Sequence, residues 1–235
     1  PFISTGDVNK DGKDDVFIGG AHKQNSKIYI SNENGLSERN IKAFQDDSGN
    51  EDMESVFTDI DNDNDLDLYV VSGGNEFLNR SVELSDRIYL NDGNGNFNRD
   101  IQQDIENYTI SGKTVISIDY DNDGDNDIIV GNRIQTGKYP IHEPSIIYEN
   151  ISGKFYNNTY NVAPEFENFG IINKIISTDF NNDGWNDFIA VGEWTNIGLF
   201  LNENGKFRNI NNESNLENLY GLWFNILETD INNDG

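Results

Sequence analysis

One acidic nine-residue pattern recurs along this chain, and its spacing limits what the chain can fold into. Complete copies occupy residues 7–15, 59–67, 119–127 and 179–187, and an incomplete copy occupies 230–235. Successive copies begin 52, 60, 60 and 51 residues apart. This spacing is too long for a helical hairpin repeat and suits a propeller blade of four short strands. The pattern therefore predicts a repeat architecture and not one continuous core.

Apolar segments of strand length flank every acidic loop. They are rich in β-branched and aromatic residues, and Asn/Gly turns separate the later ones, which is typical of consecutive hairpins. A Phe follows the last turn of three repeats, and Leu36 takes its place in the first. Each repeat is predicted to run strand, acidic loop, strand, connection, strand, turn, strand. The segments before the loops are 54–58, 114–118, 174–178 and 225–229; those after them are 16–20, 68–74, 128–131 and 188–192; the third set is 28–30, 88–90, 146–148 and 199–201; the Phe residues are Phe97, Phe155 and Phe207.

The fold class that follows is all-β, a β-propeller of four-stranded antiparallel blades. The second and third repeats carry longer connections, at 75–86 and 132–144, which we expect to lie on one face. The chain opens inside a strand-like segment and stops within a motif, so we interpret it as one propeller fragment of a longer polypeptide. Blades are predicted at about 1–49, 50–109, 110–170 and 171–219, with a further blade beginning at 220–235.

The acidic loops have the chemistry of a hard-cation site. Ca²⁺ takes six to eight oxygen ligands. Side chains at loop positions 1, 3, 5 and 9 can converge if the chain curls, and position 7 can add its backbone carbonyl. The curl needs a residue that tolerates positive φ at position 6, where Gly12, Asn64, Gly124 and Gly184 stand. We predict about one Ca²⁺ per complete loop, with ligands from Asp7, Asn9, Asp11, Lys13, Asp15, Asp59, Asp61, Asp63, Asp65, Asp67, Asp119, Asp121, Asp123, Asp125, Asp127, Asp179, Asn181, Asp183, Trp185 and Asp187, and from Asp230, Asn232 and Asp234 of the incomplete copy.

Two other interpretations of these loops are possible. An EF-hand needs a bidentate Glu at position 12, where this chain has Ile18, Val70, Val130 and Ala190 inside strand-like runs, so that class is excluded. A solvated Asp/Asn turn without an ion is the other reading, and four copies at blade spacing argue against it. The second and third loops carry a carboxylate at each of positions 1, 3, 5 and 9, whereas Asn occupies position 3 in the first and fourth. Because ligand charge sets affinity, tighter binding is predicted at the second and third loops.

The composition of the chain excludes several classes of binding partner and site. The net charge of −26, from 42 acidic and 16 basic residues, repels nucleic acid phosphates and anionic lipid surfaces, so no nucleic acid partner is expected. There are no cysteines, which excludes disulfides and thiolate metal sites. No apolar run approaches the roughly 20 residues of a membrane span, and no signal-peptide pattern opens the chain.

The loops, the glycine-ended strands after them and the Leu-Asn turns before a Phe resemble FG-GAP/VCBS repeats, as in integrin α-subunit propellers. Residues 68–76, 86–93, 137–140, 191–194 and 221–225 are similar to a bacterial branch that often carries an ASPIC/UnbV domain. The resemblance implies Ca²⁺ at each blade, usually seven blades, and an extracellular or outer-membrane location. Members are often secreted proteins or surface lipoproteins, some linked to SusC/SusD nutrient importers. The chain departs from that pattern by holding about four and a half blades and no ASPIC/UnbV region.

The sequence is compatible with three functional hypotheses. The main one is a calcium-stabilised propeller that binds a protein or glycan at the cell surface. The second is a polysaccharide lyase or hydrolase on a propeller, although the carboxylates are already assigned as metal ligands and no catalytic residue is identified. The third is a purely structural propeller arc. Trp185, Trp194, Trp223 and Tyr139 can stack on sugar rings, but packing between blades is the favoured interpretation.

Overall fold

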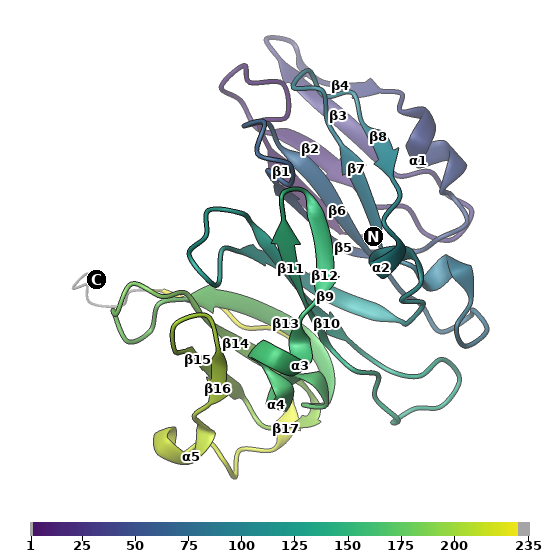
Figure 1. Cartoon of the computed structure of the whole chain (residues 1–235). Helices are drawn as coiled ribbons and strands as arrows, with labels where there is room; N and C mark the ends of the chain where they lie inside the picture. The colour runs from purple at the N-terminus through teal and green to yellow at the C-terminus, as the bar shows by residue number, and fades with distance from the viewer. Residues whose placement is uncertain (1, 230–235) are drawn as a thin grey trace.

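The computed structural model of the protein describes residues 2–229 and consists of antiparallel sheets that follow one another along the chain (Figure 1). Residues 2–229 form four sheets, each built from four strands in sequence order, with one additional short strand attached to the last. The first sheet contains β1 (Ile3–Gly6), β2 (Asp15–Ile18), β3 (Lys27–Asn32) and β4 (Gly35–Arg39); the second contains β5 (Asp52–Thr58), β6 (Asp67–Ser72), β7 (Arg87–Leu90) and β8 (Asn98–Asp100).

The third and fourth sheets repeat this arrangement. Their strands are β9 (Gly112–Ile118), β10 (Asp127–Asn132), β11 (Ile146–Ile151) and β12 (Lys154–Asn157), then β13 (Ile171–Thr178), β14 (Asp187–Thr195), β15 (Gly198–Asn202) and β16 (Phe207–Asn209). The additional strand β17 (Gly221–Leu222) pairs with the end of β14. The all-β fold with four-stranded antiparallel blades is thus confirmed.

The register places every acidic loop at the same end of its sheet. Asp67, at loop position 9, pairs with Thr58 at the start of the β5–β6 hairpin, and Asp127 pairs with Ile118 in the same way in the third sheet. The connection from the second to the third strand leaves from the other end. Each sheet therefore has an acidic-loop end and a connection end, and these two names are kept below.

The first strands of the four sheets lie next to one another: β1 contacts β5, β5 contacts β9, and β9 contacts β13. This arrangement of first strands, each followed outward by its own sheet, is that of a β-propeller. Glycines at the ends of the second strands permit the close approach. A Cβ on Gly73 would lie 2.5 Å from the carbonyl oxygen of Gly112, and a Cβ on Gly131 would lie 2.5 Å from the side chain of Ile172.

The hydrophobic core lies between the blades. Each of three buried clusters draws its side chains from two consecutive sheets. The buried rings of Phe97, Phe155 and Phe207, which follow the last turns, contribute one to each cluster, whereas Leu36 of the first sheet is exposed. Burial of apolar area between neighbouring sheets is the main stabilising term for such a repeat fold.

Short helices connect the blades, which the strand pattern did not predict. The apolar side chains of Phe44, Ile105 and Phe166 anchor three of them in the wedges between sheets. No helix within residues 2–229 is long and apolar enough to cross a membrane. The helices are α1 (Lys42–Asp46), α2 (Gln103–Glu106), α3 (Thr159–Val162), α4 (Pro164–Glu167) and α5 (Asn211–Ser214), with a 3₁₀ turn at Val82–Leu84.

Candidate metal centres

The curl of each acidic loop comes from its position 1 carboxylate. In the third loop, Asp119 accepts hydrogen bonds from the backbone N–H groups of Asp123 (3.2 Å) and Gly124 (3.1 Å). Asp7 and Asp179 make the same pair of contacts in the first and fourth loops. Because these bonds reach four and five residues ahead, they fold the loop back on itself, as an Asx turn does.

Positive φ at loop position 6 was predicted and is found in all four loops. Gly12, Gly124 and Gly184 have φ of +85°, +97° and +89°, and Asn64 has +64°. Position 4 is left-handed as well, at Lys10, Asn62, Asn122 and Asn182, which the sequence reasoning missed. The signal was present, since three of the four residues there are Asn, the non-glycine residue that tolerates this region best.

The position 9 carboxylates are buried, and each joins two backbone segments through hydrogen bonds, a contact that we call the position 9 latch. Each accepts one backbone N–H from loop position 2, at 2.9 to 3.2 Å, and another from a residue within one position of the end of the third strand, at 2.7 to 2.8 Å. Asp67, for example, joins the N–H groups of Ile60 and Asn91. The same side chain therefore closes the first hairpin and fixes the third strand against it.

Carboxylates converge in the second and third loops. Asp59, Asp61 and Asp67 each offer an oxygen within 4.8 Å of the others, and Asp119, Asp121 and Asp127 do the same. These are loop positions 1, 3 and 9. Two carboxylate oxygens in the second loop are buried without a hydrogen bond, Oδ1 of Asp59 and Oδ1 of Asp65, and the first belongs to the convergent group. A cation among the convergent oxygens would satisfy Oδ1 of Asp59, so the donor set fits a hard metal ion.

The first and fourth loops differ at position 3. There the amide of Asn181 donates to the position 5 carboxylate of Asp183 at 2.9 Å, and Asn9 donates to Asp11 at 3.4 Å. Both Asn side chains also accept the backbone N–H of position 5 through their oxygens, at 3.0 to 3.1 Å. The loop fold is thus the same with one carboxylate fewer.

Positions 5 and 7 lie outside the convergent groups. Asp63 and Asp123 are exposed, and each accepts the backbone N–H of position 7. Asp125 receives hydrogen bonds from the Asn62 amide and the Ser152 N–H, so its side chain joins the third loop to the second. Ligation through the backbone carbonyl of position 7 stays a prediction, at Lys13, Asp65, Asp125 and Trp185. Ligation through the position 5 side chain also stays a prediction, at Asp11, Asp63, Asp123 and Asp183.

The incomplete fifth copy, with Asp230, Asn232 and Asp234, lies outside residues 2–229, where the structure is described.

Burial and mutual repulsion raise the pKa of several carboxyl groups in the second and third loops. Burial raises the pKa of Asp67 to about 7 and that of Asp127 to about 8, with neighbouring carboxylates adding to the effect. Asp65 is raised to about 6 for the same reasons, and the pKa values of Asp61 and Asp121 are also raised, by burial first. A divalent cation would reverse this, because a nearby positive charge favours the ionised form.

Asparagines at or just after the third strands connect neighbouring loops, a role the sequence reasoning missed. The amide of Asn150 donates to the carbonyls of Ile60 (2.8 Å) and Asn126 (3.1 Å), which belong to successive acidic loops. Asn91 and Asn202 repeat these contacts one blade earlier and one blade later. The recurrence of Asn at this place, after Leu or Glu, was the available signal.

The connection end carries the two long insertions, and they contact each other. The Arg80 guanidinium lies 2.9 Å from the Glu143 carboxylate, and the Gly137 N–H donates to the Asn75 side chain at 2.7 Å. The prediction that segments 75–86 and 132–144 lie on one face is therefore confirmed.

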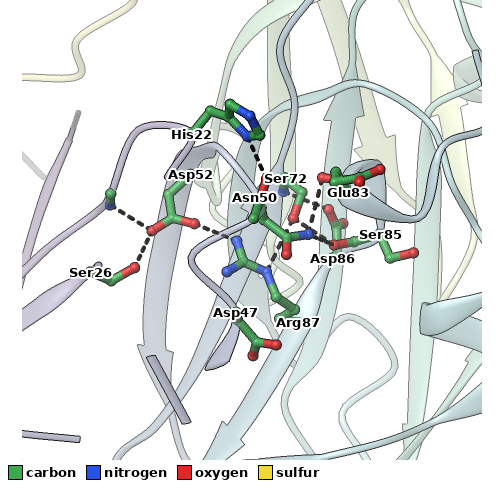
Figure 2. A network of polar contacts seen from close by, with 12 residues as sticks. His22, Ser26, Asp47, Asn50, Asp52, Ser72, Glu83, Ser85, Asp86 and Arg87 are labelled. Atoms are coloured by element: carbon green, nitrogen blue, oxygen red, sulfur yellow. Dashed lines mark hydrogen bonds and ion pairs between the residues drawn. The ribbon is translucent and has the colours of Figure 1, made fainter. Parts of the chain in front are cut away.

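A buried polar network joins the first two sheets at this end (Figure 2). Arg87 pairs with Asp52, and both side chains are only 2 % exposed. Asp52 also accepts hydrogen bonds from the Gly20 N–H (2.7 Å) and the Ser26 hydroxyl (2.5 Å) of the preceding sheet. Asp86 lies beside this pair and accepts from Ser72 N–H at 2.8 Å, and burial raises its pKa to about 7. The second sheet is therefore joined to the first by buried polar contacts as well as by apolar packing.

The prediction that the tryptophans and Tyr139 pack between blades is wrong for Trp194 and Tyr139. Trp194 is 64 % exposed and Tyr139 is 52 % exposed, so neither packs between blades. Phe, Tyr and aliphatic side chains make up the clusters there instead. Trp185 and Trp223 are half-buried.

Comparisons with known proteins agree with this geometry. No curated protein matches the chain. Among solved structures, a lectin of Agrocybe aegerita, described as specifically recognising non-reducing terminal N-acetylglucosamine, aligns with a TM-score of 0.55 at 18 % identity. The alignment covers 88 % of this chain, which spans about half of the lectin, and at this identity it shows the fold. The model of the FG-GAP-like repeat matches residues 7–70 and 59–130, more than half of the sequence. The chain belongs to the family of FG-GAP-like repeat proteins.

Proposed function

We propose that this chain is a calcium-binding extracellular β-propeller that presents a surface for binding a protein or a glycan. One observation carries the proposal: the carboxylate groups and the long insertions leave the sheets at opposite ends. A metal ion can therefore hold each blade at one end without occupying the surface at the other. Functional residues concentrate on such variable loops above a rigid scaffold.

Calcium is the metal that this donor set favours. The groups offer oxygen atoms alone, from carboxylates on a loop of nine residues. Hard cations prefer oxygen, and Ca²⁺ tolerates the irregular geometry of a curled loop better than Mg²⁺ does. Bound there, Ca²⁺ would offset the repulsion between the carboxylates, while Asp67 and Asp127 hold the hairpin to the third strand.

The location and partner belong to the same proposal. FG-GAP repeats are typical of extracellular proteins, and the fold of this chain is similar to that of a lectin. We place the protein outside the cell or on a bacterial outer-membrane surface, as a secreted protein or lipoprotein. Its role there would be to capture a ligand, in one version beside a SusC/SusD-type nutrient importer.

Calorimetric titration of the metal-free protein with Ca²⁺ tests the first half of the proposal. The expected result is about one ion per complete acidic loop, with the second and third loops binding more tightly. Absence of heat and of any change in melting temperature would overturn the calcium assignment.

The second half is tested with the calcium-loaded protein on a glycan array and on immobilised cell-surface proteins. Replacing residues 135–141 by a Gly-Ser linker should abolish binding and leave the calcium stoichiometry unchanged. Binding that survives the replacement would contradict a binding surface at the connection end. Release of cleaved products from a polysaccharide would instead identify an enzyme.

A further inference from the structure

A small cavity at the connection end of the fourth sheet is lined by exposed aromatic residues. Trp194, Tyr220, Gly221 and Leu222 enclose a volume of about 290 Å³. Trp194 and Tyr220 are 64 % and 69 % exposed, and Leu222 is 48 % exposed. We call this the aromatic cavity. Its volume is at the lower limit of small-molecule pockets, which span roughly 300 to 1,000 Å³.

Trp194 has a strained backbone conformation. Its φ is +60°, a region that bulky residues rarely adopt. Strand β17 pairs with Glu193 through Leu222 and with Thr195 through Gly221, so Trp194 is the extra residue of a bulge in β14. Glu193 and Thr195 on either side are buried. Bulges of this kind re-aim a side chain, and strain held by the surrounding structure is characteristic of binding sites.

A chain of hydrogen bonds fixes the Trp194 indole, which lines the aromatic cavity. The indole Nε1 of Trp194 donates to the Tyr139 hydroxyl at 2.6 Å, and that hydroxyl donates to Glu193 Oε2 at 3.1 Å. Arg133 completes the chain with an ion pair to Glu193 Oε1 at 2.6 Å. The 132–144 insertion thus holds the indole in place before any ligand arrives, which lowers the entropy cost of binding.

This combination matches the two-sided surface of a sugar ring. A pyranose has an apolar face of C–H groups, which packs on an aromatic ring, and an edge of hydroxyls, which needs donors and acceptors. The indole and Tyr220 supply apolar area. The half-exposed Tyr139, whose hydroxyl is bonded to the indole, supplies a polar group beside that area, and the buried Glu193 holds the hydroxyl in place. A net charge of −26 disfavours sulfated or uronic sugars. We propose that the aromatic cavity binds one neutral pyranose ring stacked on Trp194, an inference that rests on the proposed binding function.

The experiment uses the calcium-loaded chain on an array of immobilised neutral β-glycosides of glucose, galactose, mannose and N-acetylglucosamine. Binding to at least one of them is expected. Trp194→Asn should reduce its affinity at least tenfold while the fold is retained, because Asn accepts the left-handed backbone. Tyr139→Phe should reduce affinity several-fold. Trp185→Ala, in the fourth acidic loop, is the matched control and should leave affinity unchanged.

Unchanged affinity in Trp194→Asn would overturn the inference, as would absence of binding to every glycoside on the array. Both results differ from failure of the proposed function. If the glycosides do not bind but a cell-surface protein is captured through residues 135–141, the propeller is a protein-binding module and the sugar subsite is wrong. If no Ca²⁺ binds, the calcium assignment fails whatever the array shows.

Discussion

The two ends of the blades follow different rules. At the acidic-loop end, the position 9 latch recurs four times with distances that differ by at most 0.3 Å between blades. At the connection end, the contacts differ from one blade to the next, from the buried Arg87–Asp52 pair to the hydrogen-bonded Trp194. Repetition therefore supplies the scaffold, and the differences between blades supply what is specific to this protein.

Removal of calcium should have the largest effect on stability, because it acts on the acidic-loop end of every blade. An ion at one hundred times its dissociation constant stabilises the folded state by about 2.7 kcal/mol per site. Excess EDTA should therefore lower the melting temperature strongly in differential scanning calorimetry, and added Ca²⁺ should restore it. An unchanged melting curve would contradict metal binding at the repeated end.

Loss of the buried ion pair should come next and tests the connection end. Arg87→Ala leaves Asp52 charged and buried, which costs about 3 to 5 kcal/mol in the free energy of unfolding. Urea unfolding of the calcium-loaded protein measures it. The matched control is Lys42→Ala, which breaks the exposed Lys42–Asp46 pair and should cost at most about 1 kcal/mol. Equal costs for the two variants would show that the network of Figure 2 is not structural.

The pH dependence of stability separates the two ends. Burial raises the pKa of Asp86 to about 7, above its unfolded value of 3.8, so the folded state holds a proton that the unfolded state has lost. Its contribution to stability should fall as the pH rises from about 4 to 7 and stay low above that. Ca²⁺ bound at the proposed sites would hold the loop carboxylates ionised, so this slope should remain in saturating Ca²⁺. Urea unfolding at pH 5 and 8 measures this pH dependence of the free energy of unfolding, and Asp86→Asn should remove it. An unchanged pH dependence in that variant would assign the effect to another group.

Asn150→Ala tests the contacts between acidic loops. The change removes the two amide hydrogen bonds to the carbonyl oxygens of Ile60 and Asn126. These oxygens are buried or partly buried, and they lose this donor. The expected cost is about 1 to 3 kcal/mol in the free energy of unfolding, measured by urea titration. Asn94→Ala, which removes one exposed local bond to the Asp92 carbonyl, is the control and should be nearly neutral. A neutral Asn150→Ala would mean that the loops are not coupled through this residue.

The smallest predicted effect compares loops with each other. Asp121→Asn gives the third loop the position 3 residue of the first and fourth, and should weaken Ca²⁺ binding there by up to about tenfold, or ~1.4 kcal/mol. Asn181→Asp should have the opposite effect in the fourth loop. Asp123→Ala should weaken binding more than Asp11→Ala. Calorimetric titration resolves these changes, and affinities that ignore the carboxylate count would refute the charge argument.

The sequence by itself determined the repeat, the blade and the loop. The spacing of the Asp-rich pattern, the apolar runs beside it and glycine or Asn64 at position 6 each act within a few residues, where backbone preference and strand propensity are decided. The four-stranded antiparallel sheets and the positive φ at position 6 followed from these local signals.

Only the tertiary structure decided how blades meet. The partners of Asn150 lie 24 and 90 residues away, and Arg87 and Asp52 are separated by 35 residues, so neither contact leaves a local pattern to read. The exposure of Trp194 depends on a bulge, on the pairing of β17 and on the position of Tyr139 in a distant insertion. A side chain's burial is set by neighbours from elsewhere in the chain, and this is why an aromatic residue that suited a blade interface lies at the surface instead.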